Sequence, residues 1–196
     1  MTASVYNFLC KNILLYYNIN AFMFTNPVKN LKALGLREDM IVADLGAGSG
    51  FYTVPLAKMV PNGKVYALEV QNDFLTTIRN KAKEAHLDNL ECILGDVEKI
   101  GGTKLKDGIV DAIVASNILF QIEDKYKFIE EAQRILKSDG KLLLIDWSPD
   151  SKVASRFIDG IIPLNNARLL FAQKGFVWLR NIEVGEHQYG IIFKNK

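Results

Sequence analysis

Short apolar runs alternate with segments of helical spacing along the middle of the chain. The runs cover residues 40–45, 64–70, 90–94, 110–115 and 141–147, and the helical segments between them include 51–60, 72–85 and 124–136. Runs this short and this apolar are typical of strands in a parallel sheet that is covered on both faces. Strands that alternate with helices are joined by right-handed crossovers. The pattern predicts an α/β fold with a doubly wound, mostly parallel sheet.

The C-terminal part does not continue this alternation of strands and helices. A helix is predicted over 167–174, and two extended segments follow at 176–184 and 188–194. Only Gly185, Glu186 and His187 separate these two segments. A link this short forces an antiparallel hairpin. Together with the five runs, the hairpin predicts a seven-stranded sheet with an antiparallel C-terminal end.

The chain has the size and composition of one globular domain. It has 196 residues, of which 49% are hydrophobic and 23% are charged, and domains usually span about 100–200 residues. We expect this domain to cover residues 26–196. Its first helix is predicted to begin at Asn26 and Pro27, a helix cap followed by a proline, and to end at Gly35.

Residues 1–25 are predicted to form an apolar N-terminal arm. Asparagines and Lys11 interrupt its aromatic and aliphatic residues, whereas a membrane-spanning helix needs about 20 mostly apolar residues. No basic residue precedes Lys11, as a signal peptide would require. We expect the arm to cover the core or the active site. A membrane-surface role is less favoured, and a translation start at Met23 is an alternative.

Charge and cysteine content exclude several classes of protein. Lysine and arginine number 24 against 22 acidic residues, for a net charge of +2. This balance lacks the basic excess of a nucleic-acid binder. Cys10 and Cys92 lie far apart, which does not support a disulfide framework or a metal site. A cytoplasmic location fits this cysteine usage.

A glycine-rich loop follows the first predicted strand. It reads Gly46-Ala47-Gly48-Ser49-Gly50 and leads into a predicted helix. Glycines at such a turn let the backbone approach a ligand closely. Glu69 ends the next predicted strand, about 20 residues beyond the loop, where an acid can accept hydrogen bonds from both ribose hydroxyls. The combination predicts a nucleotide site at the carboxyl edge of the sheet.

The glycine spacing distinguishes two kinds of nucleotide. A dinucleotide fingerprint reads GxGxxG and would place its third glycine at position 51, where this chain has Phe51. Asp44 adds a negative charge just before the loop, which would repel a diphosphate and suits a ligand with an ammonium group. These features favour an adenosyl ligand with an amino-acid tail over a nicotinamide dinucleotide.

Several motifs resemble those of class I S-adenosylmethionine-dependent methyltransferases, in particular the small-molecule group. They are VADLGAGSGFYT at 42–53, Glu69, Gly95-Asp96 and EEAQRILKSDGKLLLIDW at 130–147, and the resemblance extends over 26–194. It implies S-adenosylmethionine as the cofactor. The positions assigned to the cofactor are Asp44, Gly46, Ala47, Gly48 and Gly50 for the methionine part, Glu69 for the ribose, Asp96 and Val97 for the adenine, Ser116 and Asn117 near the sulfonium, and Val70 as a further contact.

The chemistry does not single out one catalytic residue. A sulfonium methyl is already activated, so alignment of the acceptor is the main requirement, and a base is needed only if the acceptor must lose a proton. The candidates are Asn117, Asp146 and His187. Trp147 could line the acceptor pocket, and residues 148–166 are expected to cover it.

The segment SNILFQIEDK at 116–125 resembles the small-molecule group that includes quinone-biosynthesis enzymes. We therefore expect a small-molecule or lipid-like acceptor. Two other functions stay open, namely a noncatalytic methyltransferase-like interaction subunit and a nicotinamide-dependent oxidoreductase. The sequence does not determine the acceptor atom, the use of a base or the oligomeric state.

Overall fold

The structure is a computed structural model that describes residues 26–151 and 158–196. The predicted arm at 1–25, with its alternative start at Met23, lies outside the described residues. The same holds for part of the predicted acceptor cover at 148–166.

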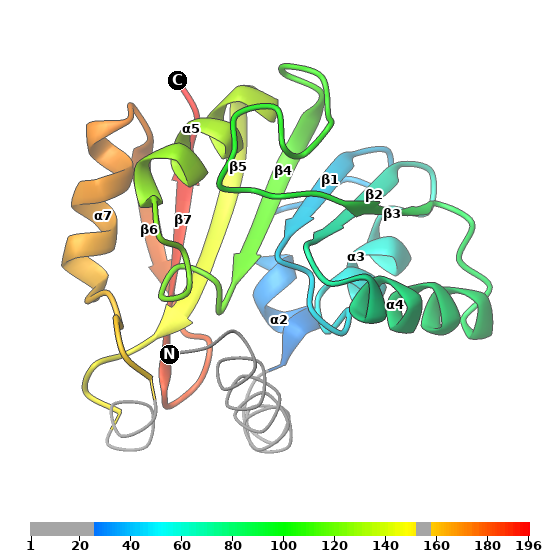
Figure 1. The fold of residues 1–196 in the computed structure, drawn as a ribbon, viewed down its shortest axis with the longest axis horizontal. Helices are drawn as coiled ribbons and strands as arrows, with labels where there is room; N and C mark the ends of the chain where they lie inside the picture. The colour runs from blue at the N-terminus through cyan, green and yellow to red at the C-terminus, as the bar shows by residue number, and fades with distance from the viewer. Residues whose placement is uncertain (1–25, 152–157) are drawn as a thin grey trace.

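A seven-stranded sheet forms the centre of the molecule, with the strand order β3-β2-β1-β4-β5-β7-β6 (Figure 1). The first five strands in this order pair in parallel, and β7 runs antiparallel to both β5 and β6. The prediction of a doubly wound sheet with an antiparallel C-terminal hairpin is confirmed. The strands are β1 (Ile41–Leu45), β2 (Lys64–Glu69), β3 (Leu90–Leu94), β4 (Val110–Ser116), β5 (Leu136–Trp147), β6 (Val177–Ile182) and β7 (Gln188–Lys194).

Helices cover both faces of this sheet. Buried Phe128 and Phe171 on α5 and α7 pack on one face, and buried Leu31 and Leu56 on α2 and α3 pack on the other. In Figure 1, α7 and β6 lie at one edge of the sheet, and β3 and α4 lie at the opposite edge. The helices are α2 (Pro27–Lys32), α3 (Thr53–Met59), α4 (Asn72–Glu84), α5 (Lys125–Ile135) and α7 (Leu164–Gln173).

Some element boundaries differ from the prediction. Strand β5 already begins at Leu136, which pairs with Val110, and it continues through the predicted turn at 138–140 to Lys141, which pairs with Ala112. At the position of the predicted turn, the pairing of β5 with β4 shifts its register, and Asp139 has a φ of 65°. Helix α3 begins at Thr53 instead of residue 51, because the glycine loop extends further than its glycines indicate.

A buried acid fixes the long connection between β3 and β4. Glu131 on α5 is fully buried and accepts hydrogen bonds from the Gly101 nitrogen (2.7 Å) and from both the nitrogen and the hydroxyl of Thr103 (3.1 and 2.5 Å). Arg134 donates to the same carboxylate at 2.7 Å. Burial raises the pKa of Glu131, but the hydrogen bonds from Arg134 and Thr103 outweigh this effect and hold the pKa at about 2.

Replacing this acid tests how strongly it stabilises the fold. We expect Glu131→Gln to lower the free energy of unfolding by about 3–5 kcal/mol at neutral pH, because it leaves Arg134 without its buried partner. Because the native pKa is depressed, the difference from the wild type should shrink as the pH falls from the ordinary glutamate range towards 2. Urea unfolding at several pH values measures both effects. The matched control is Glu130→Gln, which removes a half-exposed ion pair with Lys174 and should cost no more than about 1 kcal/mol.

Candidate active site

The glycine loop is held in place by hydrogen bonds within the protein. The nitrogens of Gly46 and Ala47 donate to the Leu68 carbonyl of β2 at 2.9 and 3.0 Å, and the Gly50 nitrogen donates to the Ala47 carbonyl at 2.9 Å. Gly46, Gly48 and Gly50 have φ values of 74°, 51° and 85°, a region that side chains disfavour. The three glycines are therefore required by the course of the backbone.

The three glycines differ in how much space a side chain or a ligand would find beside them. A Cβ atom at Gly48 would meet no atom within 4 Å, whereas one at Gly46 would lie 2.3 Å from Cδ1 of Ile118. At Gly50, the nearest atom would be Cγ1 of Ile78 at 3.0 Å. The loop is thus open to a ligand at Gly48 and is covered by Ile118 at Gly46.

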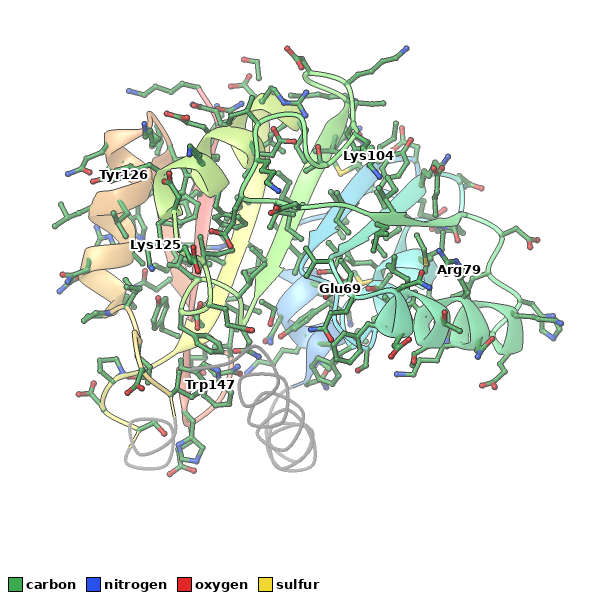
Figure 2. All side chains as sticks on the ribbon, viewed as in Figure 1. Glu69, Arg79, Lys104, Lys125, Tyr126 and Trp147 are labelled. Atoms are coloured by element: carbon green, nitrogen blue, oxygen red, sulfur yellow. The ribbon has the colours of Figure 1, made fainter. Side chains whose placement is uncertain are left out.

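Glu69, which is labelled in Figure 2, ends β2 and hydrogen-bonds this open part of the loop. Its Oε2 accepts from the Gly48 nitrogen at 3.0 Å, and its Oε1 accepts from the nitrogens of Val70 and Gln71 at 2.8 and 3.1 Å. The residue is 8% exposed. A carboxylate offers about four acceptor positions, so these three N–H groups leave one free for a ligand hydroxyl.

Asp44 lies behind the loop as a buried acid. It is 2% exposed, and its Oδ2 accepts from the Thr53 hydroxyl at 2.6 Å. Burial raises the pKa of Asp44 to about 7, with a further rise from the charge of Glu69, while the Thr53 hydrogen bond lowers it. A cationic group that approached Asp44 would favour its charged form.

Three further predicted cofactor residues, Val70, Asp96 and Val97, follow β2 and β3 at the same edge of the sheet. The side chain of Val70 is 60% exposed, while Val97 is buried. Asp96 accepts from the Glu98 nitrogen at 3.0 Å and pairs with Lys99 at 3.0 Å. The hydrogen bond from Lys99 is the main reason that the pKa of Asp96 is lowered. The exposed valine offers an apolar surface next to an ionised carboxylate.

The carboxyl end of β4 is braced by two neighbouring elements. Burial raises the pKa of Tyr52, and the nearby side chains of Asn30 and Ser116 lower it in part. Asn117 has a φ of 53°, its nitrogen donates to the Ile145 carbonyl at 2.8 Å, and its Oδ1 accepts from Nε2 of Gln188 at 2.5 Å. The strained backbone at Asn117 is thereby held by both β5 and β7.

The other two catalytic candidates lie near the ends of β5 and β7. Asp146 is buried, and its oxygens accept from the nitrogens of Leu119 and Trp147, both at 2.8 Å. Burial raises the pKa of Asp146 to about 7 in spite of these bonds. The His187 carbonyl accepts from the Ser148 nitrogen at 2.9 Å. The structure brings Asn117, Asp146 and His187 to one edge of the sheet.

Tyr189 is the cross-strand neighbour of Asp146. Burial raises the pKa of Tyr189, with a further rise from the charge of Asp146. Within the described part of the chain, its hydroxyl has no hydrogen-bond partner.

Comparison with known proteins agrees with this geometry. Residues 36–174 match the family model described as a methyltransferase domain. The chain belongs to this methyltransferase-domain family. A solved SAM-dependent methyltransferase from Aquifex aeolicus is 32% identical, with a TM-score of 0.74, and the match covers 87% of this chain and 89% of that one. The predicted superfamily and its cofactor, S-adenosylmethionine, are confirmed.

Two curated relatives match over a shorter part of their own length. The ubiquinone/menaquinone biosynthesis C-methyltransferase UbiE of Hahella chejuensis is 27% identical over 128 residues, which are 64% of this chain and 50% of that protein. A demethylmenaquinone methyltransferase of Geobacillus is 24% identical over 156 residues, or 76% of this chain and 65% of that protein. This methyltransferase-domain chain therefore spans less than two thirds of the length of either relative.

Several residues of this site were not predicted from the sequence. Thr53 hydrogen-bonds Asp44, Ile118 covers Gly46, and Gln188 holds Asn117. Of these three residues, only Thr53 could have been predicted from the sequence. A hydroxyl residue in the first helical turn after the loop lies near the strand that precedes the loop, which here ends with Asp44 and Leu45. The other two meet their partners through the packing of distant elements.

Residues 26–151 and 158–196 contain neither a cluster of metal-ligating side chains nor a helix of membrane-spanning length and apolarity. In these ranges, no group of histidine, cysteine and acidic side chains could hold a metal ion. No helix there is long and apolar enough to cross a membrane.

The raised pKa of Asp44 predicts a pH-dependent stability. Because folding favours the protonated acid, its stabilising contribution is present at low pH and is lost as the pH rises from about 4 through about 7. We expect Asp44→Asn to gain stability relative to the wild type between pH 4.5 and 8, by at most about 1.4 kcal/mol for each unit of the pKa shift. Urea unfolding across this range measures the gain.

A second substitution serves as the matched control for Asp44. Thr53→Val removes the hydrogen bond that lowers the pKa of Asp44 and should move the loss of stability to higher pH. Parallel pH profiles for the wild type and Asp44→Asn would contradict the raised pKa.

Proposed function

We propose that this protein transfers the methyl group of S-adenosylmethionine to a small, lipid-like acceptor. The observation that carries the proposal is the open backbone at Gly48 joined to the carboxylate of Glu69. Together they offer space and a hydrogen-bond acceptor at the point where a ribose would lie beside a glycine loop.

The remaining contacts follow from the order of the strands. With the ribose at Glu69, the adenine would lie along Val70 towards Asp96 and Val97, which follow the neighbouring strand. The methionine part would lie over Gly48, towards the end of β4, with its ammonium group on the side of Asp44. The buried carboxylate would then gain a cation and lose its proton.

The hydrogen bonds of the loop argue against a nicotinamide dinucleotide. A diphosphate needs free N–H groups at the loop, but the nitrogens of Gly46, Ala47 and Gly50 donate within the loop and to β2. The Gly48 nitrogen donates to Glu69. Phe51 occupies the position of the third fingerprint glycine, and its ring packs edge-on against Tyr52 at 5.1 Å.

An apolar cluster beside the site supports a lipid-like acceptor. Trp147 and Ile158 are buried together, and the partly buried Phe120 and Ile161 pack against them. The cluster lies at the carboxyl end of β5, where ligands bind in sheets of this kind. The names of the curated relatives, which refer to ubiquinone and menaquinone biosynthesis, favour a prenylated aromatic ring as the acceptor.

When bound, S-adenosylmethionine supplies an activated methyl group, and its sulfonium accepts the electron pair of the broken carbon–sulfur bond. The residues of this chain align the acceptor and receive or guide any proton that it loses. Asp146 holds the segment after β4 through the nitrogen of Leu119 and also accepts from the nitrogen of Trp147 at the end of β5, so we assign it a positioning role. Asn117 and His187 remain the candidates for direct contact with the acceptor.

A transfer assay tests this function directly. Methyl-labelled S-adenosylmethionine is mixed with the protein and a demethylmenaquinol that carries one prenyl unit, and the labelled product is extracted and measured. We expect label in the quinol. Binding of S-adenosylhomocysteine without transfer to this quinol or to its unprenylated ring would contradict the proposal and favour a noncatalytic interaction subunit.

The apolar cluster yields a separate prediction about the acceptor. Trp147→Ala should raise the KM for the prenylated quinol more than the KM for the unprenylated ring, because the substitution removes apolar surface that a prenyl group would cover. Trp178→Ala removes an exposed tryptophan on β6 and serves as the control. Equal changes for both acceptors would place the prenyl group elsewhere.

A further inference from the structure

A cavity of about 320 Å³ lies between α2 and the link that joins β6 to β7. Small-molecule sites usually measure about 300–1,000 Å³. Its lining residues are Asn26, Lys29, Asn30, Glu183, Val184 and Gly185. Both β6 and β5 run antiparallel to β7, so residues 183–185 lie at the carboxyl edge of the sheet, like the glycine loop.

One buried side chain in the wall of this cavity has a hydrogen-bond partner for only one of its two polar atoms. Asn30 is 1% exposed, and its Nδ2 donates to the Tyr52 hydroxyl at 2.9 Å. Among the residues that the structure describes, its Oδ1 has no hydrogen-bond partner. An unsatisfied buried acceptor destabilises the folded state, and such atoms are rare in folded proteins. Asn30 is therefore an acceptor that a ligand in the cavity could use.

Tyr52 lies between Asn30 and the candidate active site. Its hydroxyl accepts from Asn30 and lies near the side chain of Ser116, which lowers the Tyr52 pKa against the rise that burial causes. Ser116 is the last residue of β4 and belongs to the positions assigned to the sulfonium side of the site. A molecule held by Asn30 would thus lie on the same face of the sheet, one tyrosine away from the reacting end of the cofactor.

The charges around the cavity indicate the class of ligand. Lys29 and Glu183 contribute opposite charges, and the other polar lining residues are neutral. A phosphate or carboxylate would meet the negative charge of Glu183 as well as the lysine, so the lining favours a neutral group. The free atom of Asn30 is an acceptor, which requires a hydrogen-bond donor on the ligand.

We propose that this cavity binds the polar ring of the methyl acceptor and that Asn30 Oδ1 accepts a hydrogen bond from a neutral aromatic hydroxyl. The inference rests on the proposed function and adds the position of the acceptor and the chemical group that is recognised. Asn30 then acts as a specificity-determining residue. It orients the ring within the cavity.

A pair of probes tests this recognition without turnover. The affinities of 1-naphthol and 1-methoxynaphthalene are measured by titration calorimetry with the full chain, saturated with S-adenosylhomocysteine. The two probes share the ring, but only the naphthol donates a hydrogen bond. We expect the wild type to prefer 1-naphthol by about 5- to 10-fold, the value of one such bond. Equal affinities would overturn the proposal.

Three variants separate ligand binding from a structural role. Asn30→Leu has a similar size but no acceptor, and it should bind both probes equally. Asn30→Asp keeps the acceptor, can accept from the Tyr52 hydroxyl, and should retain the preference. Tyr52→Phe removes the same internal hydrogen bond from its other end and should also retain the preference. If Tyr52→Phe loses it as fully as Asn30→Leu does, Asn30 acts only through Tyr52 and the proposal is wrong.

A cofactor titration distinguishes this inference from the proposed function. Wild type and variants are first titrated with S-adenosylhomocysteine, and their urea unfolding confirms that they fold. Tight cofactor binding without a naphthol preference would overturn the acceptor site but leave the proposed function standing. Absence of cofactor binding by the folded wild type would contradict the proposed function itself.

Discussion

The carboxylate of Glu69 holds the glycine loop against the end of the neighbouring strand. It accepts from Gly48 in the loop and from Val70 and Gln71 beyond β2, so one buried acid determines how two parallel strands end beside each other. The loop can then pass close to a ligand at Gly48 while its other nitrogens are satisfied within the protein. The ligand therefore meets space and a carboxylate, an arrangement that suits a ribose better than a diphosphate.

A row of buried polar groups extends from this loop along one face of the sheet. Asp44 accepts from Thr53 at one end of the row, and Tyr52 accepts from Asn30 and lies near Ser116 at the other. Such groups are costly in an apolar core unless they are paired. They lie between the glycine loop and the cavity at α2, so they connect these two parts of the molecule.

The sequence predicted the features that depend on local pattern. All seven strands and the antiparallel hairpin follow from apolar runs and short links, and the glycine loop follows from its own residues and Glu69. The pattern could not reveal that Ile118 covers Gly46 or that Asn30 meets Tyr52, because these contacts join residues that are distant in the chain. The turn at 138–140 was predicted from its residues, but its inclusion in β5 depends on the pairing of Leu136 with Val110.

The central claim is that Glu69 binds the ribose of S-adenosylmethionine. It is tested most directly by titration calorimetry of S-adenosylhomocysteine with the wild type and with Glu69→Gln, after urea unfolding shows that both fold. The account predicts binding by the wild type and an affinity about 10- to 100-fold lower for the variant, since a hydrogen bond to a charged group contributes about 1.5–3 kcal/mol. Equal affinities, or a wild type that binds NADH in preference to S-adenosylhomocysteine, would contradict it.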